Sequence, residues 1–279
     1  MDEKVEYRNS LVIFIDLLGT QNRSDFDELY KINSIFHEQF EANQANDNSY
    51  KAYTRKIYTF SDCAYIIYRD RQNNPNNNGK LFTVALYNTL SILTRFLQEK
   101  MIFRGGIAYG DVYYDNDRSM FFGNAINKAY QLESKIAVNP RIVIEDEVAD
   151  IVIRFIEEQK HKIPEYIWYC GMGLLLKCPE VLDGIVEQDC DGKYIYNYLF
   201  WQENDQPFDG IGSSPDDFLQ DLAPYCMQQF SSQNKMTVID KYRYLLDFCR
   251  KKLDNLKENR DTKNTYLCFG NEDNPKQLR

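Results

Sequence analysis

The sequence has little of what several common chemistries require. Only two histidines occur, His37 and His161, so catalysis or metal binding that relies on imidazole is not expected. The seven cysteines are scattered, odd in number and never spaced as CxxC, and the simplest interpretation is a set of reduced thiols in a cytoplasm. The sequence patterns of phosphate-binding loops (GxxxxGKS/T), dinucleotide folds (GxGxxG) and nucleophile elbows (GxSxG) are missing as well.

Excess positive charge and long apolar runs are also lacking. The net charge of -9 argues against a nucleic acid or an anionic membrane as the main partner, whereas a small anionic ligand remains compatible if metal ions neutralise it. The longest apolar runs, such as Gly171 to Leu176, are too short to span a bilayer. The segment Met1 to Asn9 is charged and polar, so we expect no signal peptide and a cytoplasmic protein.

The order of hydrophobic patterns predicts an α+β fold. We expect β-α-β-β-α-β in the ferredoxin-like style, with helices on one face of a mostly antiparallel sheet and an αβ extension after it. We assign residues 1–160 to the core and 161–279 to an extension packed on the same domain. The predicted elements are a strand at 10–18, a helix at 25–43, two strands within 53–68, an exposed loop at 73–79, a helix at 82–100, a strand and hairpin at 102–114, a helix at 123–136, a strand at 141–144, a helix at 145–160, a strand at 193–201, helices at 215–229 and 235–259, and an edge strand at 265–269.

Two aspartates lie beside predicted buried strands. Asp16 interrupts the apolar run SLVIFIDLL, and Asp62 lies at the predicted turn between two strands. Each could simply accept backbone N–H bonds at a strand end. Two unpaired acids on neighbouring strands would repel each other, however, and Mg²⁺ or Mn²⁺ would remove that repulsion while binding substrate phosphates. The pair therefore predicts a site for two divalent metal ions of the kind that serves phosphoryl transfer.

Three more residues near these acids suit an anionic substrate. Gly19 and Thr20 follow Asp16 and offer backbone N–H groups where a helix is about to start, although an ordinary turn explains them equally well. Arg104 precedes two glycines, where a cation suits a phosphate or a base carbonyl; the alternative is a surface arginine at a strand start.

Four segments together resemble a known family. The segments FIDLLGT, TFSDCAY, FRGGIAYGDVY and GNAINKAYQLES follow one another with spacings similar to those of class III nucleotidyl cyclases. The resemblance covers about half of the chain, from Leu11 to Ile144. It is strongest to the bacterial pyrimidine cyclases of the Pycsar anti-phage system, which make cyclic UMP or cyclic CMP.

The resemblance implies roles for individual residues. Asp16 and Asp62 match the metal-binding aspartates, the carbonyl of Leu17 would be a further metal ligand, and Asn127 matches the asparagine that orients the substrate. It also implies a homodimer with two composite sites and a separate effector that the cyclic nucleotide activates.

Base selection would fall to two other positions. Tyr58 lies where purine cyclases carry Lys or Glu, and the resemblance implies that tyrosine there marks pyrimidine cyclases. A bulky ring can exclude a purine and stack on a smaller base, but Tyr58 could also be one of many core tyrosines. Met120 matches the second base-reading position and is also a plausible core residue.

One position departs from the family pattern. Gln131 lies where the family carries a transition-state arginine, and Arg104 or Lys128 could compensate for the lost charge. The leading hypothesis is a lyase that cyclises UTP, favoured over CTP, with a role in anti-phage defence. The alternatives are a catalytically degenerate cyclase-homology module that binds nucleotide or partners, and a dinucleotide cyclase, which lacks support because no GGDEF-like hairpin occurs.

Overall fold

The computed structural model describes residues 6–20, 24–44, 52–115, 118, 120–160, 184–204 and 214–269. Within these residues the chain forms two compact units, Met1–Tyr198 and Leu199–Arg279. The boundary differs from the expected division at residue 160 because two short strands beyond that point join the sheet of the first unit.

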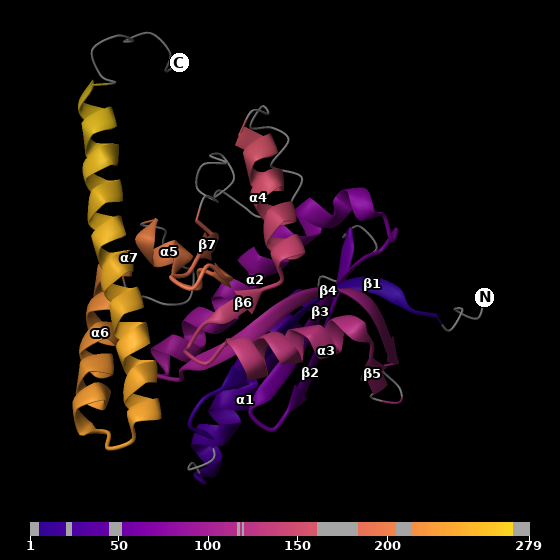
Figure 1. The fold of residues 1–279 in the computed structure, drawn as a ribbon, viewed down its shortest axis with the longest axis horizontal. Helices are drawn as coiled ribbons and strands as arrows, with labels where there is room; N and C mark the ends of the chain where they lie inside the picture. Colours follow the sequence, from indigo (N-terminus) through magenta and orange to yellow (C-terminus); the bar gives the residue numbers. More distant parts are fainter. Residues whose placement is uncertain are drawn as a thin grey trace. The chain divides into compact units, whose positions relative to one another are not determined.

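The first unit is built on one mixed, mostly antiparallel sheet (Figure 1). Its strands lie in the order β2-β3-β1-β4-β6-β8-β7, and β5 pairs with β4 beside this path. Only the β4–β6 pairing is parallel among those seen in the described residues. The strands are β1 Arg8–Leu17, β2 Tyr53–Phe60, β3 Cys63–Asp70, β4 Phe103–Asp115, β5 Met120–Phe122, β6 Ile142–Ile144, β7 Val186–Gln188 and β8 Tyr194–Tyr196.

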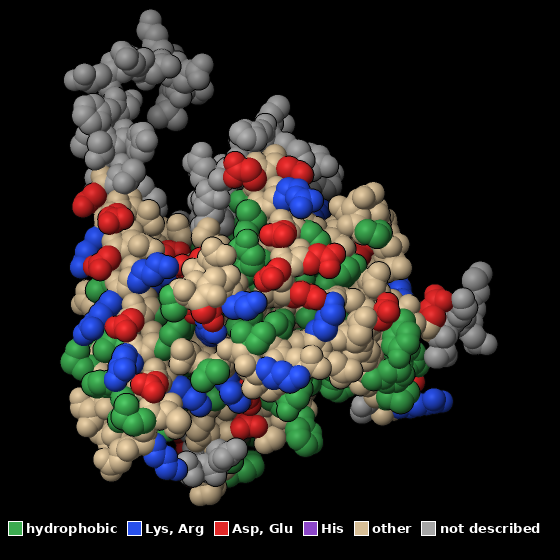
Figure 2. Space-filling model, in the orientation of Figure 1, with side chains coloured by type: hydrophobic (Ala, Val, Ile, Leu, Met, Phe, Trp, Pro, Cys, Tyr) green, Lys and Arg blue, Asp and Glu red, His purple; other side chains and the backbone are tan. Residues whose placement is uncertain are grey.

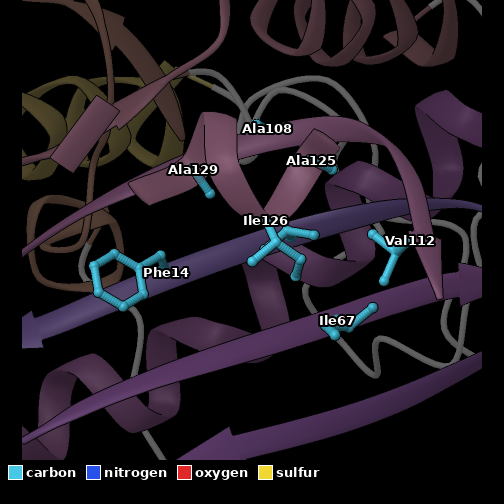
Figure 3. Close-up of a cluster of buried hydrophobic side chains, with 8 residues drawn as sticks. Phe14, Ile67, Ala108, Val112, Ala125, Ile126 and Ala129 are labelled. Atoms are coloured by element: carbon cyan, nitrogen blue, oxygen red, sulfur yellow. The ribbon is translucent and has the colours of Figure 1, made fainter. Parts of the chain in front are cut away.

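Helices cover both faces of this sheet, so the expectation of helices on one face is wrong. On one face, α3 places Ala125, Ile126 and Ala129 against residues of β1, β3 and β4 (Figure 3). On the other face, Phe82 of α2 packs on Tyr109 of β4 with ring centroids 4.9 Å apart. The helical elements of this unit are α1 Phe26–Gln44, η2 Pro75–Asn77, α2 Asn78–Gln98, α3 Asn124–Gln131, the π-helical turn η3 Leu132–Ile136 and α4 Asp146–Lys160.

Cover on both faces explains the sequence of β1. Leu11 to Ile15 are at most 4% exposed, and both edges of β1 pair with neighbouring strands. A strand buried in this way is apolar at every position rather than at alternate ones. The continuous run that predicted β1 is therefore the signature of its central place in the sheet.

Several elements begin or end at residues other than those predicted from the sequence. Helix α2 begins at Asn78 rather than at residue 82, because Asn78 is buried and its side chain accepts a hydrogen bond from the Tyr109 hydroxyl, 3.3 Å away. The strand predicted at 193–201 ends at Tyr196, and α5 follows at Phe200–Glu203. The segment 265–269 continues helix α7, so the predicted edge strand there is wrong.

The hairpin predicted inside residues 102–114 is wrong, because β4 runs unbroken to Asp115 and turns only into β5. The glycines in β4 instead permit close packing. A Cβ atom on Gly105 would lie 2.2 Å from the Phe14 carbonyl oxygen, and one on Gly106 would lie 2.1 Å from that of Ala129. Gly106 thus lets α3 lie directly on the strand.

The second unit is helical in its described residues. Besides α5 it contains α6 Pro215–Ser232 and α7 Met236–Phe269, which pack against each other. Lys252 of α7 is 1% exposed and forms an ion pair of 3.0 Å with Glu203 of α5. Among the helices that the structure describes, none combines the length and apolar character needed to span a membrane.

We expect Gly106→Ala to destabilise the first unit by about 1–3 kcal/mol, because the added methyl group meets backbone and α3 must move away from β4. Thermal unfolding followed by circular dichroism should show a midpoint lower by about 3–10 °C. The control is Ser134→Ala, an exposed change in η3. An unchanged midpoint for Gly106→Ala would contradict the close packing of α3 on β4.

Candidate active site

The sheet brings the two predicted aspartates together at one end. In the register of the sheet, Asp16 lies opposite Cys63 of β3 and opposite Arg104 of β4. The Leu17 N–H donates a hydrogen bond of 2.9 Å to the Asp62 carbonyl, which holds the β2–β3 turn against the end of β1. The turn is tight, with Ser61 in the left-handed region at φ 56°. Strand pairing alone therefore places Asp62 beside Asp16.

Arg104 and Glu133 complete the surroundings of Asp16. Arg104 Nε lies 3.1 Å from Asp16 Oδ2 and 2.6 Å from Glu133 Oε1. The Asp16 side chain is 22% exposed, whereas that of Glu133 is 3% exposed. One guanidinium group thus lies between two carboxylates at the end of the central strand.

Burial dominates the electrostatics of this cluster. Burial raises the pKa of Asp16 while Arg104 opposes that rise, and the nearby Asp62 charge adds to it. Burial likewise raises the pKa of Glu133 to about 7, with the Asp16 charge contributing in the same direction. Burial and the adjacent carboxylates raise the pKa of the Cys63 thiol to about 11, so it is protonated near neutral pH. A cluster of carboxylates with raised pKa values favours the binding of another cation.

Thr20 also lies beside the Asp16 and Asp62 pair. Its hydroxyl donates a hydrogen bond to Asp62 Oδ2, and the residue is 7% exposed. Gly19 has φ 86° and supplies the turn after β1. Helix α1 starts only at Phe26, where Asp25 accepts a hydrogen bond from the Glu28 N–H. The N–H groups of Gly19 and Thr20 are therefore not the first turn of that helix.

Tyr58 lies on β2, two strands from Asp16, and its ring is packed against another aromatic residue. The centroid of Phe121 lies 4.5 Å away at an interplanar angle of 20°. Burial raises the pKa of Tyr58 to about 12. One face of the Tyr58 ring is thus covered by Phe121. Met120 precedes Phe121 in β5, is 36% exposed and points to the opposite face of the hairpin.

Asn127 lies on the exposed side of α3. The buried side of this helix faces the sheet through Ala125, Ile126 and Ala129. Asn127 and Gln131, one turn apart, are both exposed and point away from that core. Among the described residues, the hydrogen bonds and ion pairs of the Asp16 cluster join it to Arg104 and Glu133, and none joins it to Asn127.

The donor set suits a hard divalent ion that also binds substrate. Asp16 and Asp62 supply two carboxylates, and magnesium is often held by one or two carboxylates with phosphates and water completing its shell. The described part of the chain contains no group of three or more His, Cys, Asp and Glu side chains arranged to hold a metal by itself. Water, backbone carbonyls or substrate oxygens would complete the coordination of an ion held here.

Sequence reasoning missed two residues of this region. Glu133 lies in an amphipathic segment where an acid normally faces solvent, and only the π-helical turn η3 directs it inward. Phe121 lies beside Met120 in a short strand that periodicity does not detect, and its contact with Tyr58 depends on tertiary structure.

No family model matches the chain, and no curated protein matches it.

We expect Arg104→Met to lower the free energy of unfolding by about 1–3 kcal/mol, because the buried Glu133 and the partly exposed Asp16 lose their cation. Adding Asp16→Asn should recover part of that loss, since it removes one of the two charges. Chemical denaturation of the two single variants and the double variant in the presence of a chelator measures the coupling. Strictly additive effects would contradict the ion pair.

Proposed function

We propose that the protein is a pyrimidine nucleotide cyclase that converts UTP or CTP to the 3′,5′-cyclic monophosphate and pyrophosphate. The observation that carries the proposal is the convergence of Asp16 and Asp62 at one end of the sheet, through the β1–β3 pairing and the Leu17–Asp62 hydrogen bond. Two hard carboxylates beside a buried strand end match the needs of a metal-bound triphosphate.

In the proposed reaction the ribose 3′-oxygen attacks the α-phosphorus, the bond to the β-phosphate breaks and pyrophosphate leaves. Bound Mg²⁺ or Mn²⁺ would lower the pKa of the 3′-hydroxyl and stabilise charge on the phosphates. Asp16 and Asp62 would hold the ions and so orient the triphosphate, and the Thr20 hydroxyl holds the Asp62 carboxylate through a hydrogen bond. The proton passes to water or substrate, because no general base lies among these side chains.

The location of the remaining residues favours a site shared by two chains. Tyr58 and the exposed Asn127 lie apart from the Asp16 cluster within one chain, so a second copy could supply them across an interface. Hydrophobic side chains gather over the β4–β5 hairpin in Figure 2, where Tyr7, Met120 and Phe122 are 54%, 36% and 44% exposed. Such an apolar surface is compatible with a homodimer.

We extend the proposal to a biological role by the resemblance of the four segments. The cyclic nucleotide would act as a second messenger in anti-phage defence and activate a separate effector. UTP is favoured over CTP.

One alternative has specific support. Arg104 already neutralises Asp16, and Gln131 replaces a charged residue of the family pattern. Both features favour a catalytically degenerate module that binds nucleotide or partners. The presence of two carboxylates at one strand end favours the enzyme.

The first test is the conversion of each of the four ribonucleoside triphosphates with Mn²⁺, followed by mass spectrometry. We expect cyclic UMP or cyclic CMP from the unaltered chain. Asp62→Asn should lower the rate by about 100-fold or more, because charge stabilisation at the phosphates is lost. Asp70→Asn, a matched change in a buried β3 aspartate far along the strand, is the control. Cyclic product from none of the four would contradict the enzyme proposal.

A second test addresses base selection. We expect Tyr58→Ala to reduce the preference for UTP over ATP by about tenfold, measured as the ratio of kcat/KM values, because removal of the ring enlarges the space for a base. Tyr113→Ala, on β4, is the control for loss of an aromatic ring. An unchanged UTP-to-ATP ratio in Tyr58→Ala would exclude Tyr58 from base selection.

A further inference from the structure

Arg104 serves two acids with one N–H group. Its Nε atom donates a hydrogen bond of 3.1 Å to Asp16 Oδ2. The same atom lies 2.6 Å from Glu133 Oε1, yet that oxygen receives no aligned hydrogen bond. The Nε–H group donates to Asp16, and Glu133 is the second ion-pair partner of the same nitrogen.

This arrangement is costly for a residue as buried as Glu133. Its side chain is 3% exposed, and a buried carboxylate normally receives well-aligned donors. An ion pair that served stability alone would satisfy both acids with the several N–H groups that a guanidinium offers. Glu133 can therefore take the Nε–H hydrogen bond of Arg104 if the ion pair between Arg104 and Asp16 breaks.

Asp16 is the acid from which Arg104 would be released. Its carboxylate is 22% exposed, whereas Glu133 lies deeper, so an ion from solvent reaches Asp16 first. A divalent cation and a guanidinium group repel each other when both contact one carboxylate. Binding of the cation at Asp16 therefore requires another place for Arg104.

We propose that Glu133 is a positioning residue that receives Arg104 when a divalent cation binds Asp16. Without the ion, Arg104 neutralises Asp16. With the ion bound, Arg104 stays paired with Glu133 at the inner end of the cluster, and Asp16 is free to bind the metal. The inference rests on the proposed metal role of Asp16 and adds a built-in counter-ion that competes with the metal.

The proposal predicts opposite effects at the two ends of one ion pair. Glu133→Gln keeps an acceptor oxygen but removes the negative charge that attracts Arg104, so Arg104 stays on Asp16 and Mn²⁺ binding should weaken by about five- to tenfold. Arg104→Gln removes the competing cation, so Mn²⁺ binding should strengthen by a similar factor of about five- to tenfold.

The measurement is the titration of the full-length chain with Mn²⁺ alone at mildly alkaline pH, with free Mn²⁺ followed by electron paramagnetic resonance. Circular dichroism establishes that each variant is folded, and Arg104→Met replaces Arg104→Gln if the latter is not. The matched control is Glu145→Gln, which removes the acid of the Lys128–Glu145 ion pair in the same unit and should leave Mn²⁺ binding unchanged.

The variants separate this inference from the proposed function. No Mn²⁺ binding, or binding that is insensitive to both Asp16→Asn and Asp62→Asn, overturns the proposed metal site and the inference with it. Binding that depends on Asp16 but is equal in Glu133→Gln and the unaltered chain overturns the inference alone. A change of the same sign in the Glu133 and Arg104 variants also overturns it.

Discussion

A carboxylate at the end of a fully buried strand must be compensated, and this constraint organises the first unit. Asp16 follows residues that are almost completely inaccessible, and both edges of its strand are paired. The neighbouring strands therefore have to deliver its partners. Strand β4 supplies Arg104, and the β2–β3 turn brings Asp62 within reach of its charge. The cluster forms because an acid that the sheet partly removes from water needs charged partners, and the neighbouring strands supply them.

The helices contribute as much to this cluster as the strands. Gly106 allows α3 to lie directly on β4, and the π-helical turn that follows α3 carries Glu133 to the inner side of Arg104. Close packing and the position of a charge are thus coupled. A change that moved α3 away from the sheet would also move Glu133 away from Arg104. These two residues are distant in the sequence and meet only through this packing.

The region around Tyr58 is held together by contacts between aromatic rings rather than by paired charges. Phe121 covers one face of the Tyr58 ring, and Arg69 lies 4.2 Å from the centroid of the neighbouring Tyr114 ring. These contacts fix the ring of Tyr58 in one orientation, which a residue that selects a base by shape requires. They also limit how Tyr58 can meet a base, because Phe121 covers one face of its ring.

The sequence alone determined the buried central strand, the two acids and the approximate limits of most helices, because burial and helical packing leave periodic hydrophobic patterns. Tertiary structure decided the rest. Helices cover both faces of the sheet and β4 continues through its glycines, since each of these depends on contacts distant in the sequence. The helix α7 also extends over residues 265–269. The inward orientation of Glu133 and the pairing of Phe121 with Tyr58 were likewise invisible to pattern analysis. An acid or an aromatic residue has the same local pattern whether it faces solvent or a partner, and only packing determines which one it meets.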